Sequence, residues 1–445
     1  MATATLPPGP KGYFLPGPLY QFTHDPLQFI IRTAREYGDA ARFRFIKFPV
    51  YFFSRPDLIE EVLVTQGAKF IKSADLREGG SVLGNGLLTS EGEFWRRQRR
   101  LARPAFHRER ITAYAPVITG YADEMLQTWR SGETREIRAE MMRLTLKIAA
   151  KTLFGADLQP DTVGIIGESL AAAIRQYDAR VKTGFLLKAK WSTPGNIRAR
   201  KAVQRLDKIL YGIIHHRRQT PGETDDLLSM LLSARDENGA GMNEKQLRDE
   251  VMTLLLAGHE TTATALTWTF YLLAQNPEAE AELISELKTV LSGRMPAYED
   301  LPNMRFTDAV VRESLRLYPP AWAMGRQCKE DCVVGGYDVP RNTTIYMSQW
   351  VVQHDPRYFD KPEEFRPSRW TEEFQRKLPK FAYFPFGGGP RVCIGASFAM
   401  MEATLLLAAI ASRFRLTLAP GQRIKLWPSI TLRPKLGIKF TLARR

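Results

Sequence analysis

The feature that most constrains the fold of this chain is one long helical pattern in its second half. Asn243 can cap the helix, Gln246 follows three residues later, and no proline interrupts the pattern before Pro277. At about 1.5 Å per residue this helix would be about 50 Å long, which is enough to cross a whole domain. Residues 251–269 are apolar or small on nearly every side of the helix, which indicates burial. The chain therefore needs a large helical body that encloses this segment.

The rest of the chain favours a single large domain, residues 1–445, that is mainly α-helical with small β-sheets. At an average of about 150 residues per domain, a chain of this length would form about three domains. However, no Gly/Ser linker, block of like charge or repeat divides the sequence. We expect a strand-rich N-terminal part at about residues 1–70 and a helical core at about residues 90–445.

Local sequence patterns predict where the shorter helices and the strands lie. Residues 41–53 predict a pair of strands broken at Pro49, and Ser54 would then cap a short helix with Pro56 in its first turn. The pattern is mostly helical from about residue 108 to 290, with interruptions near 192–195 and 220–222. Further strands are predicted at 332–348, with Gly335-Gly336 as a turn, at 414–418 and at 430–442.

The net charge is strongly positive, because 63 Lys and Arg outnumber 48 Asp and Glu by 15. This charge favours an anionic partner, but no nucleic-acid-binding motif accompanies it, so we expect no nucleic acid. Three cysteines fit a reducing compartment rather than a disulfide framework. Cys328 and Cys332 have no further Cys or His nearby to complete a zinc set, so we expect two packed thiols.

The sequence predicts no targeting or membrane segment. Residues 1–10 lack a basic start followed by an apolar run. No stretch approaches 18 uninterrupted apolar residues, which is about the least that a membrane span needs. We therefore expect a soluble, cytoplasmic protein without a membrane span.

The most informative segment is a glycine turn that delivers one cysteine to the start of a helix. Residues 386–395 read Phe-Gly-Gly-Gly-Pro-Arg-Val-Cys-Ile-Gly, and an apolar helical run follows. Backbone N–H groups at a helix start favour negative charge, so we expect a lowered thiol pKa at Cys393. Gly395 leaves room for a flat group beside the cysteine, and Arg391 supplies a cation for a carboxylate. A structural cysteine, or a nucleophilic one with a distant histidine base, stays open on this segment alone.

This segment resembles the haem-binding loop of the cytochromes P450, F-x-x-G-x-R-x-C-x-G, at all of its fixed positions. The resemblance implies the cytochrome P450 fold, with a long central helix over the haem, and haem b (iron protoporphyrin IX) as the cofactor. Cys393 would be the metal ligand, as a thiolate that promotes O–O cleavage. Phe386 would cover the sulfur, and Arg391 would bind a haem propionate.

A second pattern lies in the long helix, where Ala257-Gly258-His259-Glu260-Thr261-Thr262 places polar groups among apolar ones. A threonine hydroxyl can bond the carbonyl four residues back, here Ala257, and so bend the helix, while Gly258 removes a side chain. The pattern is similar to the oxygen-activating segment of the P450 family. By this resemblance the catalytic residues are Glu260, which would relay protons, and Thr261, which would hold a hydrogen bond and a water. His259 is expected to turn away.

Further sequence motifs occur in the same order as in the P450 family, and they complete the predicted haem site. Glu313 and Arg316 would pair on one helix face and join Arg369 in a structural salt-bridge network. Trp95 and Arg99 lie one turn apart and would reach a propionate, and Arg326 is a further propionate candidate. The expected cofactor-binding set is Trp95, Arg99, Arg326, Phe386, Arg391, Cys393 and Gly395.

The resemblance also places a substrate pocket with a mostly apolar lining. Its expected walls include Val82, Leu83, Leu87, Ala257, Ala321, Trp322, Ala323, Ile430 and Thr431. Such a lining predicts a small hydrophobic substrate, for example a fatty acid or a terpenoid. Three nearby cations could bind a substrate carboxylate but are expected to be plain surface charges; they are Arg175, Arg180 and Lys182.

The family resemblance implies an O2-dependent monooxygenase, with C–H hydroxylation as its reaction and electrons from a separate protein. Seven arginines from Arg96 to Arg110 would flank the docking face, so we expect an acidic ferredoxin or flavodoxin with its reductase. Two alternatives stay open: a rearranging or peroxide-using P450 without a reductase, and a non-enzymatic haem or gas-binding protein. The presence of Glu260 and Thr261 favours the monooxygenase.

Overall fold

The computed structural model describes residues 5–10, 17–45, 48–183, 191–220, 226–237 and 239–445. The α-helices are α1 Gly17–His24, α2 Pro26–Tyr37, α3 Pro56–Glu60, α4 Ala74–Glu78, α5 Gly80–Leu83, α6 Gly92–Ala102, α7 Arg108–Gln127, α8 Ile137–Phe154, α9 Pro160–Lys182, α10 Pro194–Gln219, α11 Leu227–Ser233, α12 Glu244–Gln275, α13 Pro277–Leu291, α14 Arg305–Leu317, α15 Gln349–Gln353, α16 Glu372–Lys377 and α17 Ala396–Arg413. Short 3-10 or π turns are η1 Glu61–Thr65, η2 Gly67–Lys69, η3 Arg103–Phe106, η4 Tyr298–Asn303, η5 Pro367–Arg369 and η6 Gly389–Arg391. The strands are β1 Ala40–Phe45, β2 Phe48–Phe53, β3 Phe70–Lys72, β4 Thr134–Glu136, β5 Met324–Cys328, β6 Cys332–Val334, β7 Tyr337–Val339, β8 Thr344–Met347, β9 Phe414–Leu418, β10 Leu426–Pro428, β11 Leu432–Pro434 and β12 Lys439–Arg444.

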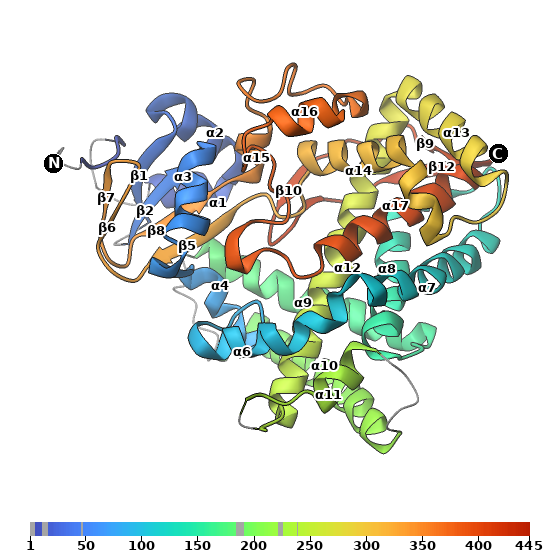
Figure 1. The fold of residues 1–445 in the computed structure, drawn as a ribbon, viewed down its shortest axis with the longest axis horizontal. Helices are drawn as coiled ribbons and strands as arrows, with labels where there is room; N and C mark the ends of the chain where they lie inside the picture. Colours follow the sequence, from blue (N-terminus) through green and yellow to red (C-terminus); the bar gives the residue numbers. More distant parts are fainter. Residues whose placement is uncertain (1–4, 11–16, 46–47, 184–190, 221–225, 238) are drawn as a thin grey trace.

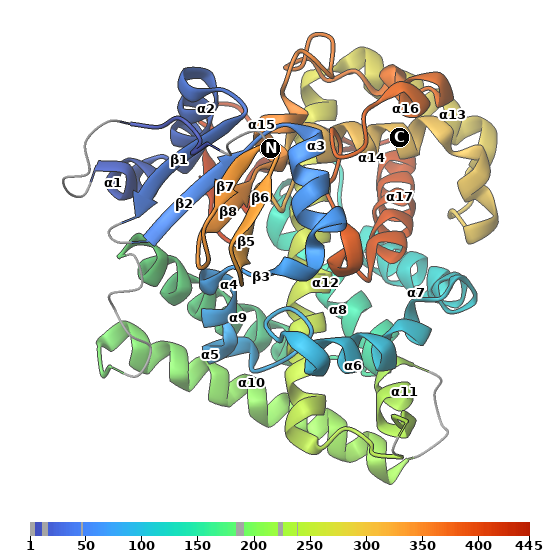
Figure 2. The same cartoon turned by 60° about the vertical axis from the view of Figure 1, so that its left-hand side comes forward.

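The long helix predicted from the sequence is α12, and it runs through the middle of the molecule (Figure 2). Its cap is confirmed, because the Gln246 N–H donates to Asn243 Oδ1 and the Asn243 N–H donates to Gln246 Oε1, both at 2.9 Å. Most of the helix is buried, including Trp268 and Phe270. Helices α8, α14 and α17 pack around it and form the helical body that its apolar surface requires.

A five-stranded sheet combines strands from the N-terminal part of the chain with β5 and β8, in the order β1-β2-β8-β5-β3 (Figure 1 and Figure 2). The predicted strand pair is confirmed, but Pro49 does not break it, since Pro49 lies inside β2 opposite Arg44. The predicted cap at Ser54 is also wrong. Its hydroxyl donates to Asp39 Oδ1 at 3.3 Å, and Arg55 occupies the cap position of α3 without a side-chain bond.

Three smaller sheets are formed mainly by the C-terminal half of the chain, and their strand β4 comes from the N-terminal half. They are the hairpin β6-β7, the pair β10-β11 and the three-stranded sheet β4-β12-β9. Gly335 and Gly336 turn the first hairpin with φ values of 56° and 82°, as the sequence predicts. Cys328 and Cys332 are both buried and free, with their sulfur atoms 3.4 Å apart, which confirms two packed thiols.

The core centres on α17, which follows the cysteine loop. Among the described residues, α17 is the one helix long and apolar enough to cross a membrane, and 67% of that stretch is buried inside the protein. One buried polar residue stands out on it. Glu402 is fully buried, and neither carboxylate oxygen has a hydrogen-bond partner within the described residues. Burial raises the pKa of Glu402 to about 8, and the nearby Thr262 hydroxyl opposes this in part.

Candidate active site

The cysteine loop is a tight turn that packs against η1 before α17 begins. A Cβ atom at Gly389, where φ is 66°, would lie 2.0 Å from the Leu63 carbonyl oxygen, so only glycine fits there. The Cys393 N–H donates to the Phe386 carbonyl at 3.0 Å and closes the loop. The Cys393 side chain is exposed to a large internal cavity. The loop therefore presents one sulfur atom to enclosed space.

The electrostatics at this sulfur correct one prediction. Burial raises the pKa of the Cys393 thiol, whereas the Gly395 N–H and the Arg99 guanidinium act in the opposite direction and are weaker. The prediction that the helix start lowers the thiol pKa is therefore wrong for the protein alone. A cation that coordinates the sulfur would reverse the balance, because a coordinating thiol loses its proton.

The cavity has a volume of about 1470 Å³ and lies between the five-stranded sheet, α12 and the cysteine loop. Pockets for a single drug-sized ligand usually measure about 300–1,000 Å³. This cavity therefore has room for a large flat cofactor and a substrate together. All of the predicted cofactor-binding residues line it, namely Trp95, Arg99, Arg326, Phe386, Arg391, Cys393 and Gly395.

Buried positive charge collects at one edge of this cavity. Arg326 is 5% exposed, and burial together with Arg391 lowers its pKa to about 10. Arg391 pairs with Glu91 at 2.7 Å, but its Nε has no partner within the described residues. The Trp95 ring lies 5.1 Å from the Arg391 guanidinium and 5.9 Å from that of Arg99. A buried cluster with more cations than anions needs further negative charge, and the two carboxylates of a haem fit this need.

The catalytic pair predicted from the sequence lies on α12 against the cavity. The Thr261 hydroxyl donates to the Ala257 carbonyl at 2.7 Å, as predicted. Glu260 is 2% exposed and accepts a hydrogen bond from Thr431 at 3.0 Å. The guanidinium groups of Arg138 and Arg433 lie 3.7 and 3.8 Å from the same Glu260 oxygen. These two arginines stabilise the carboxylate, and the sequence analysis missed both because they come from α8 and β11.

The predicted opening of α12 takes a different form in the structure. The helix is continuous from Glu244 to Gln275, and a Cβ at Gly258 would point toward α8, 3.8 Å from Ala149 and Leu153. Gly258 thus allows α8 to approach closely. His259 turns away as expected, because its ring is buried and its Nδ1 lies 2.9 Å from the Leu255 carbonyl.

A loop between α5 and α6, residues 84–91, lines the cavity and is bonded to α12 mainly through its own backbone. The Leu87 N–H donates to Glu250 at 2.9 Å, and the Asn85 N–H donates to Asp249 at 2.9 Å. The buried Lys72 ammonium donates to the Leu87 and Ser90 carbonyls at 2.9 and 2.6 Å. Buried hydrogen bonds of this kind are costly to leave unmade, so they fix the path of this loop.

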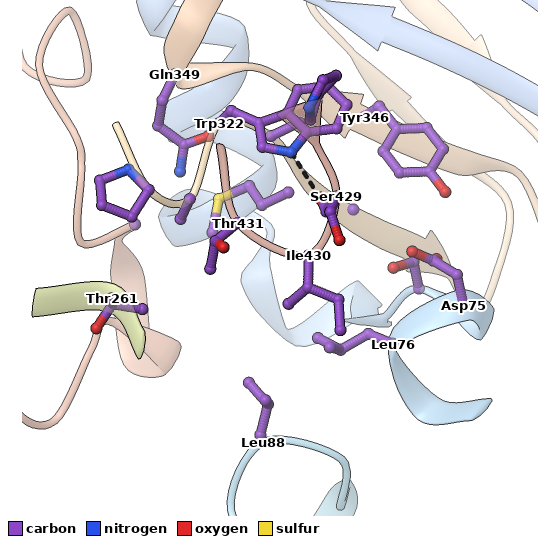
Figure 3. A pocket seen from close by; sticks show the side chains of 18 of the residues that line it. Asp75, Leu76, Leu88, Thr261, Trp322, Tyr346, Gln349, Ser429, Ile430 and Thr431 are labelled. Atoms are coloured by element: carbon purple, nitrogen blue, oxygen red, sulfur yellow. Dashed lines mark hydrogen bonds between the residues drawn. The ribbon is translucent and has the colours of Figure 1, made fainter. Parts of the chain in front are cut away.

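The substrate side of the cavity is shown in Figure 3. Figure 3 labels Trp322, Ile430 and Thr431, and most of the predicted wall lines the cavity, namely Leu87, Ala257, Ala321, Trp322, Ala323, Ile430 and Thr431. Val82 and Leu83 do not line the cavity, which corrects that part of the prediction. Both belong to α5 and pack into an apolar cluster with α12 and α8, because the loop turns toward the cavity only after Gly84.

The structural network and the surface cations are also resolved. Glu313 accepts from Arg316 at 2.8 Å and from Arg369 at 2.9 Å, and all three side chains are buried, as predicted. Arg180 differs from the expected plain surface charge, because it is buried and pairs with Glu78 at 2.7 Å. The side chain of Lys182 lies outside the described residues, and Arg175 is exposed.

The arginine-rich stretch is less uniformly cationic than its sequence indicates. Arg96, Arg97 and Arg100 pair with Glu93, Asp236 and Glu237, respectively. Arg99 faces the cavity, and Arg103 is exposed. The positive charge available to a partner is therefore smaller than seven arginines would supply.

Comparison with known proteins decides the family. The family model described as Cytochrome P450 matches residues 7–442. This chain belongs to the cytochrome P450 family. It is 38% identical over 427 residues to cyclooctatin synthase of Streptomyces melanosporofaciens, covering 95% of this chain and 92% of that protein. Cyclooctat-9-en-7-ol 5-monooxygenase of the same organism is 36% identical, with 89% and 86% covered. Pentalenene oxygenase of Streptomyces avermitilis is 33% identical, with 92% and 91% covered.

These findings confirm the predicted fold class and the enzyme class. The chain is a P450 monooxygenase, an oxidoreductase that uses O2, a hydrophobic substrate and a redox partner. The family also implies a haem-iron cofactor, and the cationic edge of the cavity fits that group.

Proposed function

We propose that this P450 hydroxylates a C–H bond of a cyclic terpenoid. The observation that carries the proposal is the mostly carbon-lined cavity that lies between Thr261 and the β10–β11 turn. The similarity to a pentalenene oxygenase and to a cyclooctat-9-en-7-ol monooxygenase supports this substrate class over a fatty acid. An apolar wall excludes water and holds a rigid hydrocarbon by shape, which suits a ring system.

The proposed cofactor is haem b, held by Cys393 as its thiolate ligand and by three arginines at its carboxylates. When bound, the haem supplies the oxygen-activating redox chemistry, which a thiolate ligand promotes. Arg326 and Arg391 would hold one edge of the group together with Trp95 and Arg99. Phe386 and Gly395 line the cavity beside the sulfur, where a side chain larger than glycine at 395 would approach Phe106.

In the proposed mechanism the chain's own polar groups move protons at one place on α12. The Thr261 hydroxyl lines the cavity and can accept a hydrogen bond from a water there while it donates its own proton to the Ala257 carbonyl. Glu260 sits beside it as the proposed proton relay, and Arg138 and Arg433 hold its carboxylate in position. Removal of either side chain would lower the rate of product formation more than it would weaken the binding of the substrate.

The proposed electron donor is a ferredoxin or flavodoxin with its own reductase. Arg103 is exposed in the turn that follows α6, and Arg99 of α6 lies near Cys393. An acidic protein would be attracted to this region by charge. If the reduction rate did not change as salt is raised, the electrostatic part of this proposal would be wrong. A cytoplasmic location, where such donors and a reducing pool occur, is proposed on the same basis.

The first test is the difference spectrum of the reduced protein with carbon monoxide. We expect the strongly red-shifted Soret band that a thiolate ligand gives, and loss of that band in Cys393→His. Turnover of a terpenoid with NADPH and a surrogate ferredoxin system should then depend on Thr261. Thr261→Val should lower product per NADPH by roughly tenfold or more, since acid–base groups contribute about 10²–10⁴-fold. The matched control is Thr264→Val, because Thr264 is buried elsewhere on α12 and does not line the cavity.

The same assay separates the alternatives. A peroxide-using enzyme would form product with hydrogen peroxide alone and would not need the ferredoxin. A haem or gas-binding protein would give the spectrum without turnover of any terpenoid. The presence of both Glu260 and Thr261 at the cavity supports the monooxygenase.

A further inference from the structure

The side of the cavity opposite Thr261 carries side-chain oxygen atoms. Figure 3 shows Asp75, Tyr346 and Ser429 there, grouped around one part of the pocket. They come from α4, from β8 and from the turn between β10 and β11. Three elements far apart in the sequence thus bring polar groups to an otherwise apolar cavity.

The hydrogen-bond donors of this group are already used. The Ser429 hydroxyl lies 2.6 and 2.7 Å from the two carboxylate oxygens of Asp178 and donates its one proton there. Burial raises the pKa of Tyr346, and the nearby Asp75 carboxylate adds to this effect by its charge and by a hydrogen bond from the Tyr346 hydroxyl. A carboxylate offers several lone pairs, and a hydroxyl that donates still accepts. What remains available to a ligand is therefore acceptor capacity.

The charge of these side chains also favours a ligand that donates a hydrogen bond. Within the described part of the chain, no Lys, Arg or His side chain forms an ion pair with Asp75. Arg180, which could have bound a substrate carboxylate, is instead paired with Glu78 at 2.7 Å. Two lysines that line the cavity next to β10 and β11, Lys425 and Lys435, are exposed. A ligand carboxylate placed beside Asp75 would face an unpaired like charge, which disfavours it.

We propose that the substrate is an alcohol, whose existing hydroxyl donates a hydrogen bond to Asp75 while its carbon skeleton extends to Thr261. This inference rests on the proposed function, since it specifies the terpenoid that the site oxidises. The new hydroxyl would then form at a carbon remote from the old one. An earlier hydroxylation or hydration reaction must supply the substrate, so this enzyme acts after that step.

The test compares ligands that differ in a single polar group. The probes are the sesquiterpene hydrocarbon drimane and the alcohol, methyl ether, amine and carboxylic acid on the same skeleton. Dissociation constants for the haem-loaded protein are measured by calorimetry and by the haem spin-state shift. We expect the alcohol to bind at least tenfold more tightly than the hydrocarbon and the ether, because a hydrogen bond to a charged acceptor is strong. The carboxylic acid should bind most weakly.

Two variants separate the acceptor from the charge. Asp75→Leu removes both, and the advantage of the alcohol should fall to less than about threefold. Asp75→Asn removes the charge alone, and the carboxylic acid should gain about fivefold or more. The matched control is Asp161→Asn, an exposed aspartate at the start of α9, which should change neither ratio. Retention of the carbon monoxide spectrum shows that each variant is folded.

Each outcome decides the inference. Equal binding of alcohol and hydrocarbon, or an alcohol preference that persists in Asp75→Leu, would refute it. A preference for the amine over the alcohol would also refute it and would indicate a cationic ligand. Oxidation of drimane without any preference would leave the proposed function standing while this inference fails. Selective binding of the alcohol without its oxidation would support the inference and refute the proposed function.

Discussion

The buried carboxyl group of Glu402 makes the stability of this protein depend on pH. The folded protein holds the pKa of Glu402 at about 8, against an ordinary value of 4.5. The folded form therefore binds one more proton than the unfolded chain between these pH values, and stability falls as pH rises through that window. At about 1.4 kcal/mol per pKa unit, the ceiling on this loss is about 5 kcal/mol. Water that enters beside the charge would reduce it, so we expect about 2–3 kcal/mol.

The change that tests this reasoning is Glu402→Gln, which keeps the shape and cannot ionise. Urea unfolding of the haem-loaded protein, followed by tryptophan fluorescence, gives the free energy of unfolding at about pH 5 and about pH 8.5. The variant should gain about 2–3 kcal/mol relative to the natural chain between these two pH values. Glu282→Gln, an exposed position on α13, is the control and should show no such gain. A difference between Glu402→Gln and the natural chain that stays constant with pH would refute the argument.

Three further changes follow from the geometry. Arg369→Leu removes one hydrogen-bond partner of the buried Glu313 carboxylate, so the free energy of unfolding, measured by urea titration, should fall by about 3–5 kcal/mol. A fall of less than about 1 kcal/mol would contradict the structural role of this network. Arg326→Leu should weaken haem retention by roughly tenfold or more in transfer to apomyoglobin, with unchanged retention as the contrary result. Leu87→Ala should change terpenoid dissociation constants severalfold, whereas Val82→Ala should not, because only the first side chain lines the cavity; equal effects would contradict the placement.

Much of the fold was accessible from local sequence rules. The α12 helix was predictable to within a residue because its start is fixed by a local capping box and its end by a proline. The strands β3, β4 and β5 were missed because each is short and is formed by pairing with segments distant in the sequence, and β10 was missed because it has only three residues. The break at Pro49 was wrong because Pro49 can occupy a strand position that needs no N–H donor, which the sequence of one strand does not reveal.

The residues of the active site show the same difference between local and long-range signals. Residues that the family marks by spacing, such as Cys393 and Arg326, were found correctly at the cavity. Arg138 and Arg433 were not, because a charge that reaches Glu260 from another element carries no local signal. The thiol pKa of Cys393 was predicted in the wrong direction for a similar reason, since burial is a property of the whole fold.

The way that residues 84–91 are attached to α12 bears on how this enzyme can change over evolutionary time. Asp249, Glu250 and Lys72 bond to N–H and carbonyl groups, which every residue except proline carries. The side chains of Leu87 and Leu88 are therefore exchangeable without any loss of these bonds. A lineage can reshape the binding cavity by single substitutions here while the protein stays folded, and a laboratory search for new selectivities has the same freedom at these two positions.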